Sequence, residues 1–200
     1  MPRQLPVLML VAMVAMSGPA LSQNVPTRIR GTIQRLEGDT LVINGRDGDT
    51  LPVQLAPGFT VAAVVPASLA DAKPGSFIGA AATGPKDHLR ALEVLIFPEA
   101  GRGSGEGHYP WDLQPESTMT NATVESEVSS SDGRMLTMVA KGETLQMTVP
   151  PNTPIVTFEP GSPAMLVPGA AVFVGAQKAA DGKLTAARVN VGKDGLVPPM

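Results

Sequence analysis

A short segment rich in glycine and proline carries several side chains that are able to do chemistry. Glu106, His108 and Asp112 follow the spacing Glu-x-His-x-x-x-Asp, and His108 is one of two histidines in the chain. Carboxylate oxygen and imidazole nitrogen on one loop can ligate a metal ion. A single imidazole is weak support for a transition-metal site. The segment therefore predicts a metal site as one of three alternatives.

The other two alternatives use the aromatic rings of the same segment. Tyr109 and Trp111 are the only tyrosine and the only tryptophan of 200 residues, and Met119 follows them. In one hypothesis these three residues form a ligand-binding platform. In the other, the rings of Tyr109 and Trp111 form a structural staple between two domains. A staple would bury the rings and pair the indole N–H and the phenol O–H. Of the three readings we expect the staple.

The rest of the chain offers little for catalysis. It has no cysteine, and neither histidine belongs to a G-x-S-x-G motif. The segment "GRGSGEG" (Gly101 to Gly107) lacks the lysine and the helix of a phosphate-binding loop. A flexible linker explains it better. We therefore expect no catalytic residues, no enzyme activity and no cofactor, with a metal ion as the alternative.

The beginning of the chain has the three parts of a secretory signal peptide. Arg3 precedes the apolar run "VLMLVAMVAM" (Val7 to Met16), and "SGPALS" follows it, with Ala20 and Ser22 suited to cleavage before Gln23. A membrane span needs about 20 apolar residues, and this run is shorter. We expect residues 1–22 to be removed and the protein to reach the periplasm, without stable membrane insertion.

The charge of the chain limits its partners. The formal net charge is −3, and no stripe of basic residues occurs. Nucleic acids attract clustered lysine and arginine, so we expect no nucleic-acid partner. The partner is expected to be a small ligand or an unknown envelope protein.

The strongest structural signal is an internal repeat. "GDTLVINGRDGDTLPVQLAPGFTV" (Gly38 to Val61) matches "GRMLTMVAKGETLQMTVPPNTPIV" (Gly133 to Val156), and each reads as strand, polar turn, strand. Further along, Leu89, Ala91, Val94 and Ile96 of "LRALEVLI" match Leu184, Ala186, Val189 and Val191 of "LTAARVNV". The offset stays at 94 or 95 residues, as expected for a tandem duplication.

The order of elements in each repeat predicts the fold. Each contains five apolar-alternating strands, and "SLADAK" (Ser68 to Lys73) predicts a short helix between the third and fourth strands of the first repeat. This is the element order of the OB-fold, so we expect an all-β protein of two tandem five-stranded OB-like barrels. A generic sandwich or meander is the alternative. The strands expected in the first repeat are 27–36, 40–44, 50–65, 76–82 and 88–97.

These elements predict the domain boundaries. We expect a signal peptide (1–22), a first barrel (23–98), a linker (99–120), a second barrel (121–192) and a disordered tail (193–200).

The repeats also resemble a known family. The run "GDTLVI…DGDTLPVQL…SLADAKPGSFIGAAATG…LRALEV" and the ending "VPGAAVFVGAQKAADGKLTAARVNV" (Val167 to Val191) are similar to the bacterial exported domains grouped as DUF5666. Ser76 and Ala170 depart from the acidic residue that usually follows Pro-Gly there. The resemblance implies export and an OB-like fold, and implies no activity. We therefore expect an exported, non-enzymatic binding protein, with an envelope metal-handling protein as the alternative.

Export leads to a testable prediction. Mass spectrometry of the mature protein is expected to find an N-terminus near Gln23, because signal peptidase cuts after small residues. An intact Met1 recovered in the membrane fraction would contradict it.

Overall fold

The protein is all-β in the computed structural model, which describes residues 27–130 and 133–200. The signal peptide expected at residues 1–22 lies outside the described residues. No helix of the described part is long and apolar enough to cross a membrane. The strands are β1 (Thr27–Glu37), β2 (Thr40–Gly45), β3 (Thr50–Pro66), β4 (Phe77–Thr83), β5 (Leu89–Ile96), β6 (Gly107–Pro110), β7 (Thr118–Ser130), β8 (Gly133–Ala140), β9 (Glu143–Val149), β10 (Ile155–Pro160), β11 (Ala171–Lys178) and β12 (Leu184–Gly192).

The strands form where apolar residues alternate. In β9, for example, Leu145, Met147 and Val149 are buried while the residues between them are more exposed. One buried and one exposed face is what period-two patterning produces. The five strands expected in the first repeat are confirmed, since β1 to β5 lie within one or two residues of their expected bounds.

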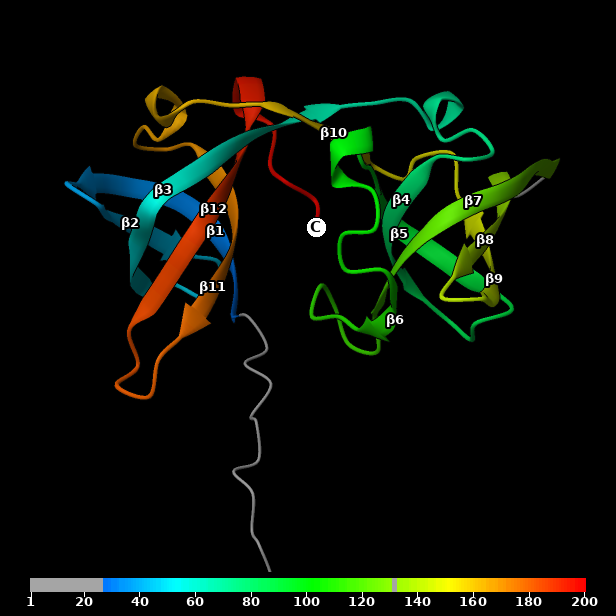
Figure 1. The fold of residues 1–200 in the computed structure, drawn as a ribbon, viewed down its shortest axis with the longest axis horizontal. Coiled ribbons are helices and arrows are strands. Elements are labelled where there is room, and N and C mark those ends of the chain that lie inside the picture. Colours follow the sequence, from blue (N-terminus) through cyan, green and yellow to red (C-terminus); the bar gives the residue numbers. More distant parts are fainter. Residues whose placement is uncertain (1–26, 131–132) are drawn as a thin grey trace, which may run out of the picture.

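Ten of these strands form two closed rings of paired strands (Figure 1). The first ring runs β1–β2–β3–β12–β11 and returns to β1, which makes a closed five-stranded barrel. The second ring runs β4–β5–β9–β8–β7 and returns to β4. In both rings the strand that comes third in its repeat lies parallel to the strand that comes last in the other repeat.

Each ring therefore combines strands from both repeats. The first ring takes three strands from the first repeat and two from the second, and the second ring takes the complementary set. This differs from the expected division, in which residues 23–98 and 121–192 each close a barrel. The physical reason is that β3 does not turn back into its own ring. It is 17 residues long and continues to the other ring, as in domain-swapped dimers.

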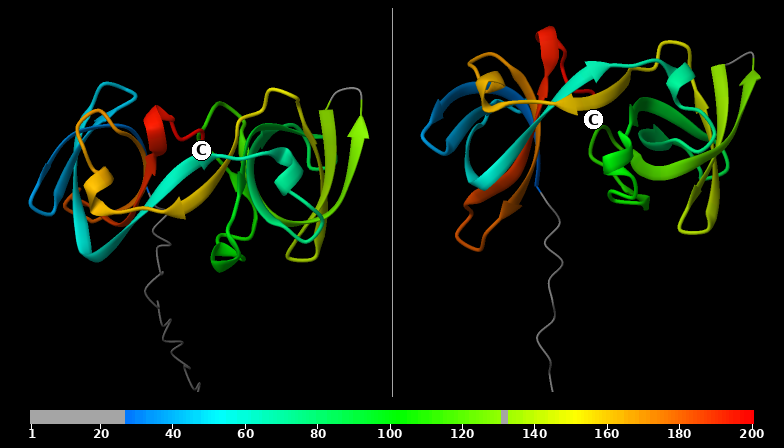
Figure 2. Two further views of the ribbon diagram at one scale, coloured as in Figure 1. Left: turned by 90° about the horizontal axis from the view of Figure 1, so that it is seen from above. Right: turned by 45° about the horizontal axis from the view of Figure 1, so that its top comes forward.

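A two-stranded ribbon joins the rings. The last residues of β3 pair antiparallel with β10, with Val64 opposite Phe158 and Pro66 opposite Val156. Figure 2 shows the two strands running side by side between the rings. Val61 of β3 and Val156 of β10 are corresponding positions of the two repeats. The last part of β3 therefore pairs with the segment that corresponds to it in the other repeat. That is the self-complementary contact of a two-fold interface, here within one chain.

Apolar side chains fill three separate clusters. The inside of the first ring holds one, with Ile43, Val53 and Val174 fully buried, and the inside of the second ring holds another. The third and smallest lies between the rings and joins Val64, Leu95 and Val156 to Met200. The space between the rings is thus partly packed.

Two expectations about shorter elements need correction. The short helix expected between the third and fourth strands is a single 3-10 turn, η1 (Leu69–Asp71). The second repeat has a similar turn, η3 (Pro163–Met165). The other 3-10 turns are η2 (Glu99–Gly101) and η4 (Lys193–Gly195). In η1 the Ser68 hydroxyl caps the turn, and Pro74 follows too closely for a helix to continue.

Residues 193–200, expected to be a disordered tail, are ordered against the protein. Met200 is only 3% exposed, and its main-chain oxygen accepts a 2.7 Å hydrogen bond from Nε of Arg30. Its apolar side chain packs into the third cluster, so burial explains the order.

The exchange of strands predicts that a cut chain stays together. A specific protease site inserted after Gly103, an exposed residue between the repeats, is expected to yield two fragments that co-elute on a native sizing column. Each ring would still hold strands from both fragments. Separation in denaturant would be the positive control. Two free fragments under native conditions would contradict the exchange.

Candidate functional site: a cavity between the two rings

A partly open cavity of about 690 Å³ lies between the two rings. Residues of β11 and β12 line it on the first ring, and residues of β4, β5 and β7 line it on the second. The β3–β10 ribbon, the segment around η2, the residues Tyr109 and Trp111, and Met200 complete the lining. The volume is in the range of sites for small organic ligands.

Most of the aromatic residues of the protein gather around this cavity. The chain has seven, and five of them line it: Phe97, Tyr109, Trp111, Phe158 and Phe173. The rings of Trp111 and Phe173 are 6.2 Å apart between centroids, and so are those of Phe97 and Phe158. All five side chains remain partly exposed. A chain poor in aromatic residues has thus concentrated them on one concave surface.

Trp111 connects the segment between the repeats to the first ring. The guanidinium of Arg28 lies 3.9 Å from the centre of an indole ring, and Phe173 flanks the same side chain. Tyr109, next to Trp111 with 6.2 Å between the ring centroids, belongs to β6, which pairs with β7 of the second ring. The two aromatic residues therefore reach both rings, as a staple would, and they also line the cavity, as a platform would.

The polar groups of the cavity are incompletely paired. Three buried side-chain atoms among the described residues have no hydrogen-bond partner: Oε2 of Glu93, Nε1 of Trp111 and Oδ1 of Asn121. All three residues line the cavity. Buried polar atoms are nearly always paired in folded proteins, so such groups call for an explanation. Their common position makes the cavity the best candidate for a binding site.

Glu93 is the most unusual of these residues. It is 1% exposed, and only its Oε1 atom is paired, accepting a 3.2 Å hydrogen bond from the Ala81 amide. Burial raises the pKa of Glu93 to about 8, against the weaker opposing effects of that hydrogen bond and of Arg30. Near neutral pH the side chain is therefore an uncharged acid, able to donate through one oxygen and accept through the other.

A bulge directs Glu93 into the cavity. Ala81 and Ala82 pair with Glu93 and Ala91, which leaves Leu92 as an extra residue in β5. Leu89 and Ala91 before the bulge, and Val94 and Ile96 after it, all point into the second ring. The extra residue shifts the alternation, so Glu93 and Leu95 face outward instead.

The repeat places a second set of side chains on the opposite wall. Arg188 and Asn190 of β12 correspond to Glu93 and Leu95 of β5, and all four line the cavity. The positions of β5 and β12 that point into the rings are apolar in both strands. Those that face the cavity differ in charge and size, so its two walls present different chemistry.

Arg188 has no acidic partner in the described part of the chain. Its Nε donates a 3.0 Å hydrogen bond to Oδ1 of Asn190, and its guanidinium carbon lies 4.8 Å from the ring centre of Phe158. The Asn190 amide in turn donates to the main-chain oxygen of Phe173 at 3.1 Å. The guanidinium is held over an aromatic face at the edge of the cavity.

The hypothetical metal ligands point to three different partners. Oε1 of Glu106 accepts from the Lys141 amide at 2.8 Å, and Nδ1 of His108 lies 2.8 Å from the Thr120 hydroxyl. Asp112 accepts a 2.8 Å hydrogen bond from Arg30. Within residues 27–130 and 133–200 no group of three histidine, aspartate or glutamate side chains is arranged to hold a metal ion.

The ion pairs of Asp112 instead hold in place two arginines that lie against the aromatic wall of the cavity. Burial alone would raise the pKa of Asp112, but the Arg30 hydrogen bond and the charges of Arg30 and Arg28 hold that pKa below its usual range. Arg28 lies 3.6 Å from the same carboxylate oxygen. Asp112 thus fixes the two arginines that flank Trp111 and Phe173.

The sequence identified one part of this site and missed another. Tyr109, Trp111 and Met119, the residues of the hypothetical platform, all line the cavity. Glu93 and Arg188 were missed, because each stands in a strand that the alternation of its apolar residues identifies. Their signal was available: both interrupt matching apolar runs, at the same place in the two repeats.

The chain was compared with protein-family models, with curated proteins and with solved structures. None of them matches.

The buried acid predicts a characteristic effect of pH on stability. Between its ordinary pKa of 4.5 and about 8, Glu93 keeps its proton in the folded protein and loses it on unfolding. The free energy of unfolding of the wild type then falls as pH rises, by up to about 1.4 kcal/mol per pH unit. Glu93→Gln is expected to remove this slope in urea denaturation from pH 5 to 9.

The matched control is Glu125→Gln, at an exposed position of β7. It should leave the slope unchanged, because its carboxylate is in solvent. A stability difference between Glu93→Gln and wild type that stays constant with pH would contradict the neutral buried acid.

Proposed function

We propose that this is an exported, non-enzymatic binding protein, and that it holds a small amphipathic molecule in the cavity between the rings. The observation that carries the proposal is the coincidence of unpaired buried polar atoms with an aromatic-lined cavity of about 690 Å³. Pockets of this size, mostly apolar with a few placed polar groups, are typical of small-molecule sites.

We further propose that both rings are OB-like barrels with exchanged strands. In each, the strands follow the order first, second, third, fifth, fourth along the ring, with the third and fifth parallel. This order supports the OB-like assignment, and the resemblance to DUF5666 agrees with it. The apolar N-terminal run supports secretion to the periplasm.

Binding explains the polar groups of the cavity better than catalysis does. Glu93, Asn121, Arg188 and Asn190 supply hydrogen bonds and charge around an aromatic lining. No histidine occurs among the described residues that line the cavity, and a pair of nucleophile and base is not apparent there. A protein that only binds needs no such pair.

The test uses a neutral fluorescent probe, N-phenyl-1-naphthylamine, whose emission rises in apolar surroundings. We expect saturable binding, with energy transfer from Trp111, the only tryptophan. Trp111→Ala and Phe173→Ala are each expected to weaken binding about tenfold or more, because each removes an aromatic wall of the cavity.

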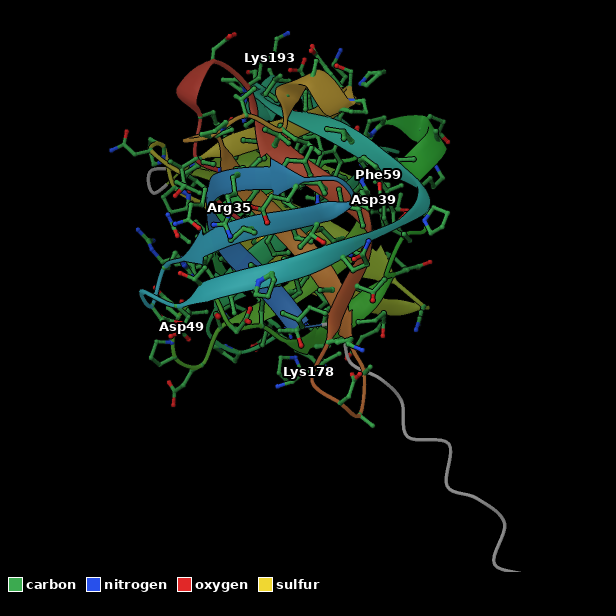
Figure 3. The ribbon with its side chains drawn as sticks, turned by 90° about the vertical axis from the view of Figure 1, so that its left-hand side faces the viewer. Arg35, Asp39, Asp49, Phe59, Lys178 and Lys193 are labelled. Atoms are coloured by element: carbon green, nitrogen blue, oxygen red, sulfur yellow. The ribbon has the colours of Figure 1, made fainter. Side chains whose placement is uncertain are left out.

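Phe59→Ala is the matched control. Phe59 is a partly buried phenylalanine that packs against the core of the first ring and does not line the cavity. Figure 3 shows it on the side of the molecule that faces away from the second ring. This variant should bind the probe as the wild type does. The proposal fails if the probe does not bind, or if all three variants bind it equally well.

A further inference from the structure

Three arginines lie in or beside the cavity, although the whole chain has a formal net charge of −3. Arg188 lines the cavity, and Arg28 and Arg30 lie over the rings of Trp111 and Phe173, which also line it. Arg28 and Arg30 share the side-chain carboxylate of Asp112, and Arg30 also donates to the main-chain oxygen of Met200. Arg188 forms no ion pair with any described residue, and Glu159, another cavity residue, is 3.2 Å from the ammonium of Lys193. Arg188 is therefore a cation of the cavity lining that no carboxylate of the described residues neutralises.

Oδ1 of Asn121 is an unpaired acceptor, whereas the unpaired groups of Trp111, Arg188 and the protonated Glu93 can donate hydrogen bonds. The indole N–H of Trp111 can only donate, and it is buried without a partner. Arg188 uses its Nε for Asn190, while its terminal nitrogens bond to no described side chain or carbonyl. Oxygen atoms bearing a full charge are the strongest acceptors for donors of this kind.

From this arrangement we infer that the cavity binds an amphipathic anion, in which an apolar body carries one carboxylate, sulfonate or phosphate group. The inference rests on the binding function proposed above and specifies its ligand class. The anionic group would face Arg188 and the Trp111 N–H. The apolar body would lie against Phe97, Phe158 and Leu95, which surround the same space.

A cationic ligand fits the same surfaces poorly. Amines and quaternary ammonium groups bind to the faces of aromatic rings. Here guanidinium groups already lie over those rings: Arg28 over Trp111, Arg30 over Phe173 and Arg188 over Phe158. A second cation would be repelled by all three.

Glu93 makes the affinity for an anion depend on pH. Arg30 on β1 is the charge that acts on Glu93, and the other charged and titratable residues that line the cavity are Arg188 on β12, Tyr109 on β6 and Glu159 on β10. Burial raises the pKa of Tyr109, which therefore stays neutral through the range of interest. Below about pH 8 Glu93 is an uncharged donor, and above it becomes a carboxylate that repels the ligand.

The experiment compares two probes that differ by one charged group. 8-Anilino-1-naphthalenesulfonate is N-phenyl-1-naphthylamine with a sulfonate added. At pH 6.5 the full-length mature protein is expected to bind the sulfonate probe at least about tenfold more tightly than the neutral one. Arg188→Gln is expected to bring the dissociation constants of the two probes closer together, mainly by weakening the binding of the sulfonate probe. Trp111→Phe keeps an aromatic ring and loses the N–H, so it should also weaken the binding of the sulfonate probe.

The control is Arg35→Gln, which removes one positive charge from an exposed arginine (Figure 3) that lies outside the cavity. It should leave the preference intact. Between pH 7 and 9 the affinity for the sulfonate probe should fall in the wild type and stay level in Glu93→Gln. Circular dichroism would establish that each variant is folded.

The outcomes separate the two proposals. If the neutral probe binds in the cavity and the sulfonate probe binds no better, the anion inference is wrong and the binding function stands. The same holds if Arg188→Gln and Arg35→Gln have equal effects. If neither probe binds the wild type, both proposals are wrong.

Discussion

The antiparallel pairing of β3 with β10 is the contact on which the rest of the structure depends. Because β3 runs on into this ribbon, β4 and β5 are delivered to the second ring, and β11 and β12 return to the first. The ribbon also joins the two rings along one side. The cavity lies between the rings, and residues of this ribbon form part of its lining.

The chemistry of the cavity follows from the duplication. Positions that point into a ring must stay apolar in both repeats, since each ring needs a packed core. Outward positions are free of that requirement, and at the shared boundary they have diverged: an acid on one wall, an arginine on the other. Gly79 and Phe173 differ in the same way, at matching places in β4 and β11. A side chain at Gly79 would meet Oδ1 of Asn121 at 2.6 Å and the ring of Phe97 at 3.1 Å, so Asn121 and Phe97 occupy the space that a side chain would take.

The sequence predicted the local structure well and the assembly of the rings less well. Period-two alternation located β1 to β5, and the repeat located their counterparts, because burial of one strand face is a local property. The exchange was not predictable, since β3 offers the same apolar face to a neighbour from its own repeat or from the other. For the site, the rarity of Trp111 and Tyr109 was informative. Glu93 was overlooked because the effect of the Leu92 bulge on side-chain direction depends on pairing with β4.

The exchange of strands also determines when the protein can fold. Thr27 of β1 pairs with Ala176 of β11, close to the far end of the chain, so the first ring closes only by forming a very large loop. Topologies dominated by such distant contacts fold slowly. Until β11 and β12 are in place, β1 and β3 keep unpaired edges, and unpaired edges invite aggregation. The joining of the rings therefore carries a kinetic cost: neither can act as an early, independently folded nucleus for the other.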